Sequence, residues 1–507
     1  MSGTLSLVLA SVARIFEPAS FFFMLFGTLE GVIIGALPGL SGSIGIILLL
    51  PLVYRLESDI ALVMLCGVFC GSMFGGSVSA ILLNTPGTPS AAATLLDGYP
   101  LAKRGQGGKA IGTGAIASFI GGIISSLCLM LVAPQLSKVA LQFQAADYFS
   151  LALFGLTMVA ASTGKNVLKG LISAAFGLFI ATVGVDPIQG ASRFTFGNHY
   201  LMNGFPLLPV LIGIFAISEV LAQAAERSTG NVQFQEKSVK NLLPSFKEIK
   251  SFFWTTIVGS VIGVLVGIVP GTGGSISTFM AYDVCKKFSK HPEEYGNGAL
   301  EGIAACESSN NGTTGGALIP MLSLGIPGDV VTSVMLSALV LIGITPGPQI
   351  FTENADMIYV IFVGMFVIQF LMLGLGLIFA RWAPYVLRIP TKILMPIILV
   401  LCIVGAYSQS NQVYHVLVAF IFGVVGLFMK KYGYPGAPLI LGIVLGPLAE
   451  NNLNRALQIS KNDWSILLRR PISLTFIILS ILFVTVQVRA LYLERKKEKQ
   501  AAGSEAN

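Results

Sequence analysis

Apolar residues dominate the chain in long runs that alternate with short polar loops. Two of these runs, Ala110–Ser137 and Met357–Ala380, contain no charged residue over 28 and 24 positions. About 20 apolar residues suffice for a helix to cross a bilayer, and the runs lack the alternation that a membrane-spanning strand requires. The pattern therefore predicts an all-α polytopic membrane protein with about ten to twelve transmembrane segments, some of them partial.

One apolar run carries the residues that interrupt helices. Residues 31–46 read GVIIGALPGLSGSIGI, with five glycines and a Pro-Gly pair. Proline lacks the N–H that a helix uses and clashes with the preceding turn, so the pair should end one half-helix and begin another. Backbone freed in this way is tolerated at membrane depth only where protein or a water-filled cavity satisfies it. The run therefore predicts a discontinuous or re-entrant helix.

The same pattern occurs twice. Residues 31–44 align without gaps with residues 263–276, with eight identities in fourteen positions. A second Pro-Gly pair follows 48 residues after the first pair in one copy and 57 residues after it in the other. The sequence thus predicts two repeats, each with two breaks.

The charges of the loops indicate how the two copies are oriented. The loop after the first copy, 103–109, holds three bases, whereas the corresponding loop after the second, 345–357, holds none and two acids. The loops inside the copies reverse this asymmetry, because 54–59 has one base and two acids while 285–298 has three lysines. Since cytoplasmic loops are enriched in Lys and Arg, the copies are predicted to be inverted repeats, as in many secondary transporters.

These features divide the chain into seven predicted segments. They are an interfacial N-terminal helix (1–16), the first repeat of a transport core (17–105), intervening transmembrane helices (106–222), a cytoplasmic linker (223–249), the inverted second repeat (250–350), C-terminal transmembrane helices (351–488) and a cytoplasmic tail (489–507).

The breaks are also the candidate binding site. An isolated Pro-Gly pair can be a packing kink, but four pairs in two related copies, each beside Ser, Thr or Asn, favour a site. Half-helix N-termini attract carboxylates, and freed carbonyls with Ser, Thr and Asn oxygens suit sodium. The candidate substrate- and ion-binding residues are Pro38, Gly39, Ser41, Ser43, Asn84, Thr85, Pro86, Gly87, Pro270, Gly271, Thr272, Ser275, Glu307, Asn310, Asn311, Thr314, Pro327 and Gly328. Within this set a sodium ion is placed at Ser43, Asn84, Ser275 and Asn310.

Three acids lie within or beside apolar runs, where an ionisable group is a functional candidate by default. They are Glu30, Glu219 and Glu307. We favour Glu307 because it begins the polar stretch ESSNNGTT.

Other functional classes find little support. The net charge of +7 is spread over short loops, which does not indicate nucleic-acid binding. The chain has no phosphate-binding GxxxxGK[ST] loop and no HExxH, and its three histidines show no metal spacing. An enzyme is therefore not expected, nor a cofactor other than a coupling sodium ion or proton.

Several stretches together resemble the large membrane subunit of the tripartite tricarboxylate transporters. They are GALPGLSGSIG, NTPGTPSAAATLLDGYPLAKRGQGGKA, GIVPGTGGS, YGNGALEGIAACESSNNGTTGGALIP and LSLGIPGDVVTSVMLSALVLIGITPGP. The resemblance covers most of the chain and weakens towards its C-terminal end. It departs at Glu307–Ser309, beside the asparagines, and at Asp329, an acid where a small residue is common.

The resemblance implies a multi-pass protein of the bacterial inner membrane that imports a tri- or dicarboxylate, driven by a sodium or proton gradient. The implied partners are a small membrane subunit of four helices and a periplasmic solute-binding protein. Two alternatives remain open at this point: a self-sufficient carrier for dicarboxylates or amino acids, and a channel without coupled transport. The symmetry fits an elevator or a rocking movement alike.

Overall fold

The structure is a computed structural model that describes residues 2–161, 167–186, 188, 190–225, 241–408 and 410–504. These residues are overwhelmingly helical, so the prediction of an all-α polytopic membrane protein is confirmed. Among them, seven helices are long and apolar enough to cross a membrane, and seven shorter apolar helices of 10–17 residues accompany them.

The helices of the N-terminal half begin immediately and follow closely on one another. They are α1 (Ser2–Ile15), α2 (Pro18–Ala36), α3 (Gly42–Val53), α4 (Ser58–Leu83), the 3-10 turn η1 (Pro89–Ala91), α5 (Leu95–Leu101), the π-helical turn η2 (Ala102–Gln106), α6 (Gly107–Ala140), α7 (Ala145–Ala161), α8 (Val167–Ala181), η4 (His199–Leu201), α9 (Leu207–Leu211), the π-helical turn η5 (Ile212–Ile217) and α10 (Ser218–Ala225).

The C-terminal half continues in the same way. Its helices are α11 (Phe246–Ile268), α12 (Gly273–Phe288), α13 (Leu300–Leu324), α14 (Val330–Leu341), α15 (Ile350–Glu353), α16 (Ala355–Val386), α17 (Thr391–Ser408), α18 (Val413–Lys431), α19 (Gly436–Ile459), α20 (Ile466–Arg469) and α21 (Pro471–Ser504). Of the predicted linker, residues 226–240 lie outside the described residues, as do residues 505–507 of the predicted tail.

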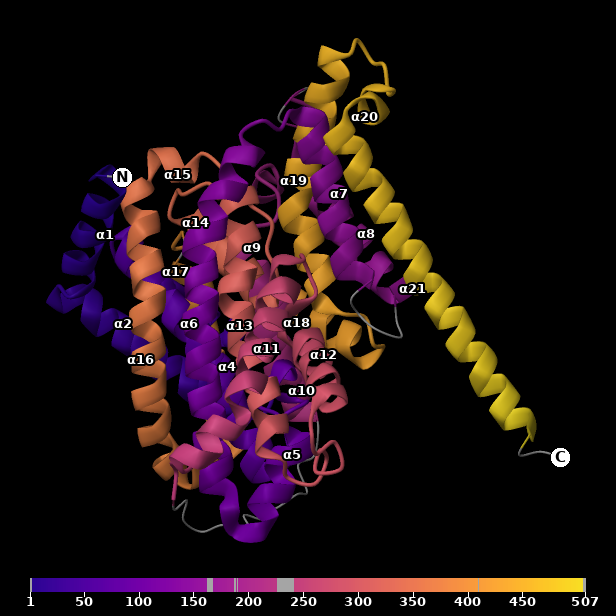
Figure 1. Ribbon diagram of the computed structural model, residues 1–507. Helices are drawn as coiled ribbons and strands as arrows, with labels where there is room; N and C mark the ends of the chain where they lie inside the picture. Colours follow the sequence, from indigo (N-terminus) through magenta and orange to yellow (C-terminus); the bar gives the residue numbers. More distant parts are fainter. Residues whose placement is uncertain are drawn as a thin grey trace. The chain divides into compact units, whose positions relative to one another are not determined.

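The chain forms two compact units, and the first comprises Met1–Leu141 and Leu211–Gly423. Within it α2 packs along α4, and α11 packs along α13 in the same way. The long helix α6 packs on α13, while α16 packs on α4 (Figure 1). The long helix that comes after each copy in the chain therefore packs against the other copy.

Regularly spaced glycines explain the close packing of these pairs. At each of them an added methyl group would overlap the neighbouring helix, most often its main chain. Small residues let helices approach closely where no hydrophobic force acts between them in lipid. The glycines recur every four residues on α2 and α11: Gly27, Gly31 and Gly35, and Gly259, Gly263 and Gly267.

The second unit comprises Gln142–Val210 and Val424–Asn507. In it α19 packs against α7 and α8, and α21 packs along α7. Arg470 Nη2 donates a hydrogen bond to the buried carboxylate of Asp147 over 2.7 Å, and this ion pair joins the start of α7 to the start of α21. Two short antiparallel strands, β1 (Gly184–Val185) and β2 (Ser192–Arg193), pair with Gly184 opposite Arg193.

Candidate functional site

The four Pro-Gly pairs that the sequence analysis singled out, at 38–39, 86–87, 270–271 and 327–328, all interrupt helices, as the sequence predicts. The first pair lies between α2 and α3, and the second lies between α4 and η1. The third lies between α11 and α12, and the fourth lies between α13 and α14. Each helix thus ends within three residues of a proline that cannot donate to the helix.

The first break of a copy reverses the chain rather than kinking it. On α2, Gly27 contacts Met64 and Gly35 contacts Ser72, so α2 and α4 run parallel. On α3, Gly42 contacts the side chain of the same Ser72, whereas Gly45, further along, contacts Val68. Helix α3 therefore runs antiparallel to α4, and α2 and α3 form a hairpin.

The two breaks of each copy meet. A methyl group added to Gly87 would lie 2.0 Å from the carbonyl oxygen of Gly35, at the end of α2. One added to Gly328 would lie 2.8 Å from the carbonyl oxygen of Gly267, the equivalent residue of α11. In the second copy the amide of Gly271 also donates to the Gly328 carbonyl over 2.7 Å. In each copy, the first and second breaks therefore lie against each other.

Equivalent helices of the two copies run in opposite directions. Asn310 Nδ2 on α13 donates to the carbonyl oxygen of Met73 on α4 over 3.0 Å. One turn later on α13, Thr314 contacts Cys70, one turn earlier on α4, through a side-chain hydrogen bond. The antiparallel crossing of α4 and α13 is the relation that a pseudo-two-fold axis produces.

The breaks of one copy also touch those of the other. Gly42, which begins α3, lies near the side chain of Val331 in α14. Gly274, the equivalent residue of α12, lies near the side chain of Ser90 in η1. The contacts are reciprocal, as pseudo-symmetry requires. All four breaks therefore converge in one region of the first unit.

Two helix N-termini in this region lack a side-chain cap. The N-cap residues Ser41 of α3 and Thr272 of α12 make no capping hydrogen bond. In contrast, Asp329 caps α14, because its Oδ1 accepts from the amide of Thr332 over 2.7 Å. Asp329, the acid at which the sequence departs from the family's pattern, therefore accepts a hydrogen bond from an amide at the start of its own helix. Uncapped N-termini present amide groups and partial positive charge, which suit a carboxylate.

Buried polar side chains line the adjoining face of α13. Glu307 accepts hydrogen bonds from Thr94 Oγ1 and from Ser118 Oγ, the latter over 3.2 Å. Among the described residues, Asn310 Oδ1 and both side-chain polar atoms of Asn311 have no partner, although both residues are fully buried. Buried polar atoms are costly unless something binds them, so these amides are candidates to hold an ion or substrate group.

The structure distributes the predicted site residues unevenly. The buried residues are Ser43, Gly87, Pro270, Glu307, Asn310, Asn311, Thr314, Pro327 and Gly328. The half-buried residues are Pro38, Ser41, Pro86, Gly271, Thr272 and Ser275, and the exposed ones are Gly39, Asn84 and Thr85. Thr272 Oγ1 donates to the end of the preceding helix α11, to the Val269 carbonyl over 2.8 Å. Within the part of the chain that the structure describes, no hydrogen bond joins any two of Ser43, Asn84, Ser275 and Asn310, the predicted sodium set.

The sequence analysis missed Asp97. Its Oδ1 accepts from the amides of Gly296, Gly298 and Ala299, each over 2.8 Å, although Asp97 follows the break of the other copy. The carboxylate therefore caps the start of α13 across the repeats. A signal was present, because Asp97 and the glycines lie in two of the long characteristic stretches of the sequence, residues 84–110 and 295–320.

The two other acids of the apolar runs also lie near the first break. Glu219 Oε1 would be 2.9 Å from a methyl group on Gly39. Both carboxylate oxygens of Glu30 would be 3.1 Å from one on Gly45, in α3. These contacts place acidic groups around α3.

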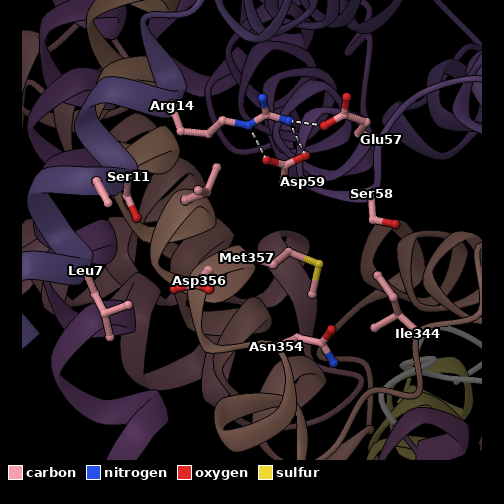
Figure 2. Close-up of a pocket in the computed structure, with 12 residues that line it drawn as sticks. Leu7, Ser11, Arg14, Glu57, Ser58, Asp59, Ile344, Asn354, Asp356 and Met357 are labelled. Atoms are coloured by element: carbon pink, nitrogen blue, oxygen red, sulfur yellow. Dashed lines mark hydrogen bonds and ion pairs between the residues drawn. The ribbon is translucent and has the colours of Figure 1, made fainter. Parts of the chain in front are cut away.

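A separate cavity of about 460 Å³ opens between α1, the start of α4 and the start of α16 (Figure 2). On its wall Arg14 Nε donates to Asp59 Oδ2 over 2.6 Å, and Arg14 also contacts Glu57. Hydrogen bonding to Asp59 raises the pKa of Arg14 above its usual value. With Asp356 the lining carboxylates outnumber this one guanidinium, so the cavity is acidic.

Comparisons with known proteins agree with the sequence motifs. A family model described as the tripartite tricarboxylate transporter TctA family matches residues 21–441, a range that includes all four breaks. The chain is 35% identical over 470 residues to an uncharacterized 52.8 kDa protein in the TAR-I ttuC′ 3′ region of Agrobacterium vitis, covering 92% of this chain and 93% of that protein. It is 37% identical over 223 residues to an uncharacterized protein in the TAR-II ttuC′ 3′ region of the same bacterium, covering 44% of this chain and 92% of that protein. No solved structure matches the chain.

Proposed function

The chain belongs to the tripartite tricarboxylate transporter TctA family, and we propose that it is the large permease subunit of a binding-protein-dependent importer of tri- or dicarboxylates. In this proposal it lies in the bacterial inner membrane. A periplasmic solute-binding protein delivers the substrate, a small four-helix membrane subunit completes the permease, and a sodium or proton gradient drives uptake.

The convergence of the four breaks supports this proposal most directly. Two uncapped helix N-termini, at Ser41 and Thr272, lie in the region where the inverted copies meet. They offer amide groups to carboxylates without a fixed cation, which lets the substrate leave again. Opposed copies around one site are the geometry from which alternating access follows.

Uptake in proteoliposomes tests the proposal. The chain is reconstituted with its small subunit, the cognate binding protein is added outside, and uptake of labelled tri- and dicarboxylates is followed under an inward sodium gradient, an inward proton gradient or neither. We expect uptake that requires the binding protein and one of the gradients.

Two other results would each contradict the proposal. Gradient-driven uptake by the chain alone would indicate a self-sufficient carrier. Equilibration of carboxylate or of small ions regardless of gradients would indicate a channel.

A further inference from the structure

The carboxyl group of Glu307 is enclosed by segments of both copies. Glu307 lies on α13 of the second copy and is fully buried. Thr94 Oγ1, which follows the second break of the first copy, donates to Glu307 Oε1. Ser118 Oγ on α6 donates to Glu307 Oε2 over 3.2 Å, and Ser77 on α4 lies beside the same carboxyl group. This carboxyl group therefore joins α13 to the first copy and to α6.

No basic side chain accompanies this acid. In the part of the chain that the structure describes, the side chains that act on the Glu307 carboxyl group are those of Ser77, Thr94 and Ser118, which are all uncharged. Burying a charge is costly unless it is paired. A cation or a proton therefore has to balance Glu307 in at least one state of a transport cycle.

The hydroxyl partners of Glu307 suit a group that changes its protonation state. A Ser or Thr hydroxyl donates to a carboxylate, and after rotation it accepts from the O–H of a carboxylic acid. Asp97 differs, because its Oδ1 accepts from three backbone amides, which can only donate. The hydroxyls of Thr94 and Ser118 also bond directly to the Glu307 carboxylate, which leaves no space between them for a metal ion. These contacts favour a proton over sodium.

Few other buried groups around α13 titrate. On the helices that pack against α13, the described ones are Cys66 and Cys70 of α4, Asp97 of α5, and Tyr282 and Cys285 of α12. On α13 itself, Cys306 precedes Glu307. Thiols and phenols are uncharged near neutral pH. Because Asp97 is bound by amides, Glu307 is the group of this set that changes its charge without losing its hydrogen bonds.

Polar side chains continue along α13 from Glu307 towards the fourth break. Asn311 lies one turn further on the same face, and both its side-chain polar atoms have no partner among the described residues. The hydroxyl of Thr314, in the next turn, lies 3.5 Å from that of Ser125 on α6. The acid is therefore connected by polar groups to the region where the breaks converge.

We propose that Glu307 binds the coupling proton of the carrier. Its carboxylate accepts a proton from water on the side to which the site is open, and an O–H bond forms at one carboxylate oxygen. After the two copies have moved, that bond breaks and the proton leaves to water on the opposite side. This inference rests on the proposed carboxylate uptake and names the proton, rather than sodium, as its coupling ion.

Transport by proteoliposomes that contain the chain and its small subunit, with the binding protein on both sides, tests the inference. One measurement follows uptake of a labelled di- or tricarboxylate under an inward proton gradient, while a pH dye reports protons that enter the lumen with it. Another follows exchange of labelled for unlabelled substrate without a gradient. Wild-type protein is compared with Glu307→Gln, and Glu294→Gln, in the exposed loop after α12, is the matched control.

Glu307→Gln should separate exchange from accumulation. The amide is close in size to the protonated acid and carries no charge, but it has no proton to release. We expect accumulation under the proton gradient to fall at least about tenfold and the lumenal pH signal to disappear, while exchange stays within about twofold of wild type. The control should match the wild-type protein in all three measurements.

Three results would overturn the inference and leave the proposed function standing. The first is proton-driven accumulation by Glu307→Gln. The second is wild-type uptake that follows a sodium gradient without a lumenal pH signal. The third is loss of both exchange and accumulation in a folded Glu307→Gln protein, which would indicate a structural or substrate-binding role. Absence of gradient-driven carboxylate uptake by the wild-type protein would contradict the proposed function as well.

Ser118→Ala decides the question should Glu307→Gln fail to fold. It removes a hydroxyl that stabilises the carboxylate but keeps the acid, so proton-driven uptake should be half-maximal at a higher pH than in the wild-type protein. An unchanged pH dependence of uptake in this variant would overturn the inference.

Discussion

Asn310 on α13 donates a hydrogen bond to the carbonyl oxygen of Met73 on α4 over 3.0 Å, and this bond joins the two inverted copies where their helices cross. Met73 lies in a helix that is buried along almost its whole length. The other side-chain atom, Oδ1, has no partner among the described residues. The same amide can therefore hold the copies together and take part in the site.

Asn310→Ala should reduce both uptake and stability. The substitution removes the bond to Met73 and the unpartnered oxygen, so we expect at least about a tenfold loss of uptake and a destabilisation of about 1–3 kcal/mol. Uptake in proteoliposomes and thermal unfolding in detergent measure the two effects. Asn297→Ala, in an exposed loop, is the matched control. Undiminished uptake by Asn310→Ala would remove this residue from the site.

Asn84 should behave differently, although the sequence analysis grouped it with Asn310. It is exposed and ends α4 with a φ of 55°, a conformation that glycine adopts without strain. Asn84→Gly should therefore retain uptake and stability, whereas Asn84→Val should cost about 1–2 kcal/mol through backbone strain. Thermal unfolding and uptake of both variants measure this. Loss of uptake by Asn84→Gly in a stable protein would show that the side chain binds an ion or substrate.

The sequence predicted the breaks because their cause is local. Proline removes a donor and glycine adds backbone freedom wherever they occur, so the ends of α2, α4, α11 and α13 follow from four dipeptides. The opposite orientation of the copies was also readable, since loop charge reports the side of the membrane. It agrees with the antiparallel crossing of α4 and α13.

Contacts between copies could not be read from the sequence in the same way. Asp97 and Gly298 are about 200 positions apart, and no local rule pairs an acid with amides at that distance. The reversal of the chain at Gly39 could not be predicted from the sequence either, because a Pro-Gly pair is compatible with a kink or a hairpin. Packing of α3 against both α2 and α4 decides between them.

The glycines Gly27, Gly31 and Gly35 of α2 allow a test of how closely α2 packs against α4. A methyl group at Gly35 would lie 2.3 Å from the carbonyl oxygen of Ser72, a main-chain atom that cannot move aside cheaply. Gly35→Ala should therefore destabilise the protein by more than about 2 kcal/mol. Gly374→Ala in α16 meets nothing within 4 Å and should be neutral or slightly stabilising. Thermal unfolding and folded yield in detergent measure both, and equal effects would contradict the close approach of α2 and α4.

Asp97 should contribute to stability through three amides at once. Asp97→Ala leaves three main-chain donors at the start of α13 without their acceptor, and we expect a loss of about 3 kcal/mol or more. Asp97→Asn keeps an acceptor oxygen and should lose less. Thermal unfolding measures the difference, with Asp463→Ala in the loop after α19 as the control. Equal loss in the two Asp97 variants would indicate that the charge, rather than the acceptor geometry, carries the effect.

Arg14 should hold α1 against the body of the first unit. Its guanidinium makes two hydrogen bonds to Asp59, at 2.6 and 3.1 Å, and also contacts Glu57 (Figure 2). It contacts Glu17 as well. Arg14→Gln removes the guanidinium that contacts these three carboxylates, so it no longer offsets their mutual repulsion. We expect faster proteolysis between α1 and α2 and a decrease in stability that is larger at low than at high salt concentration, because salt screens the repulsion. Arg55→Gln removes an exposed arginine of the same region and should change neither measurement, and an identical response of the two variants would show that Arg14 is not an anchor of α1.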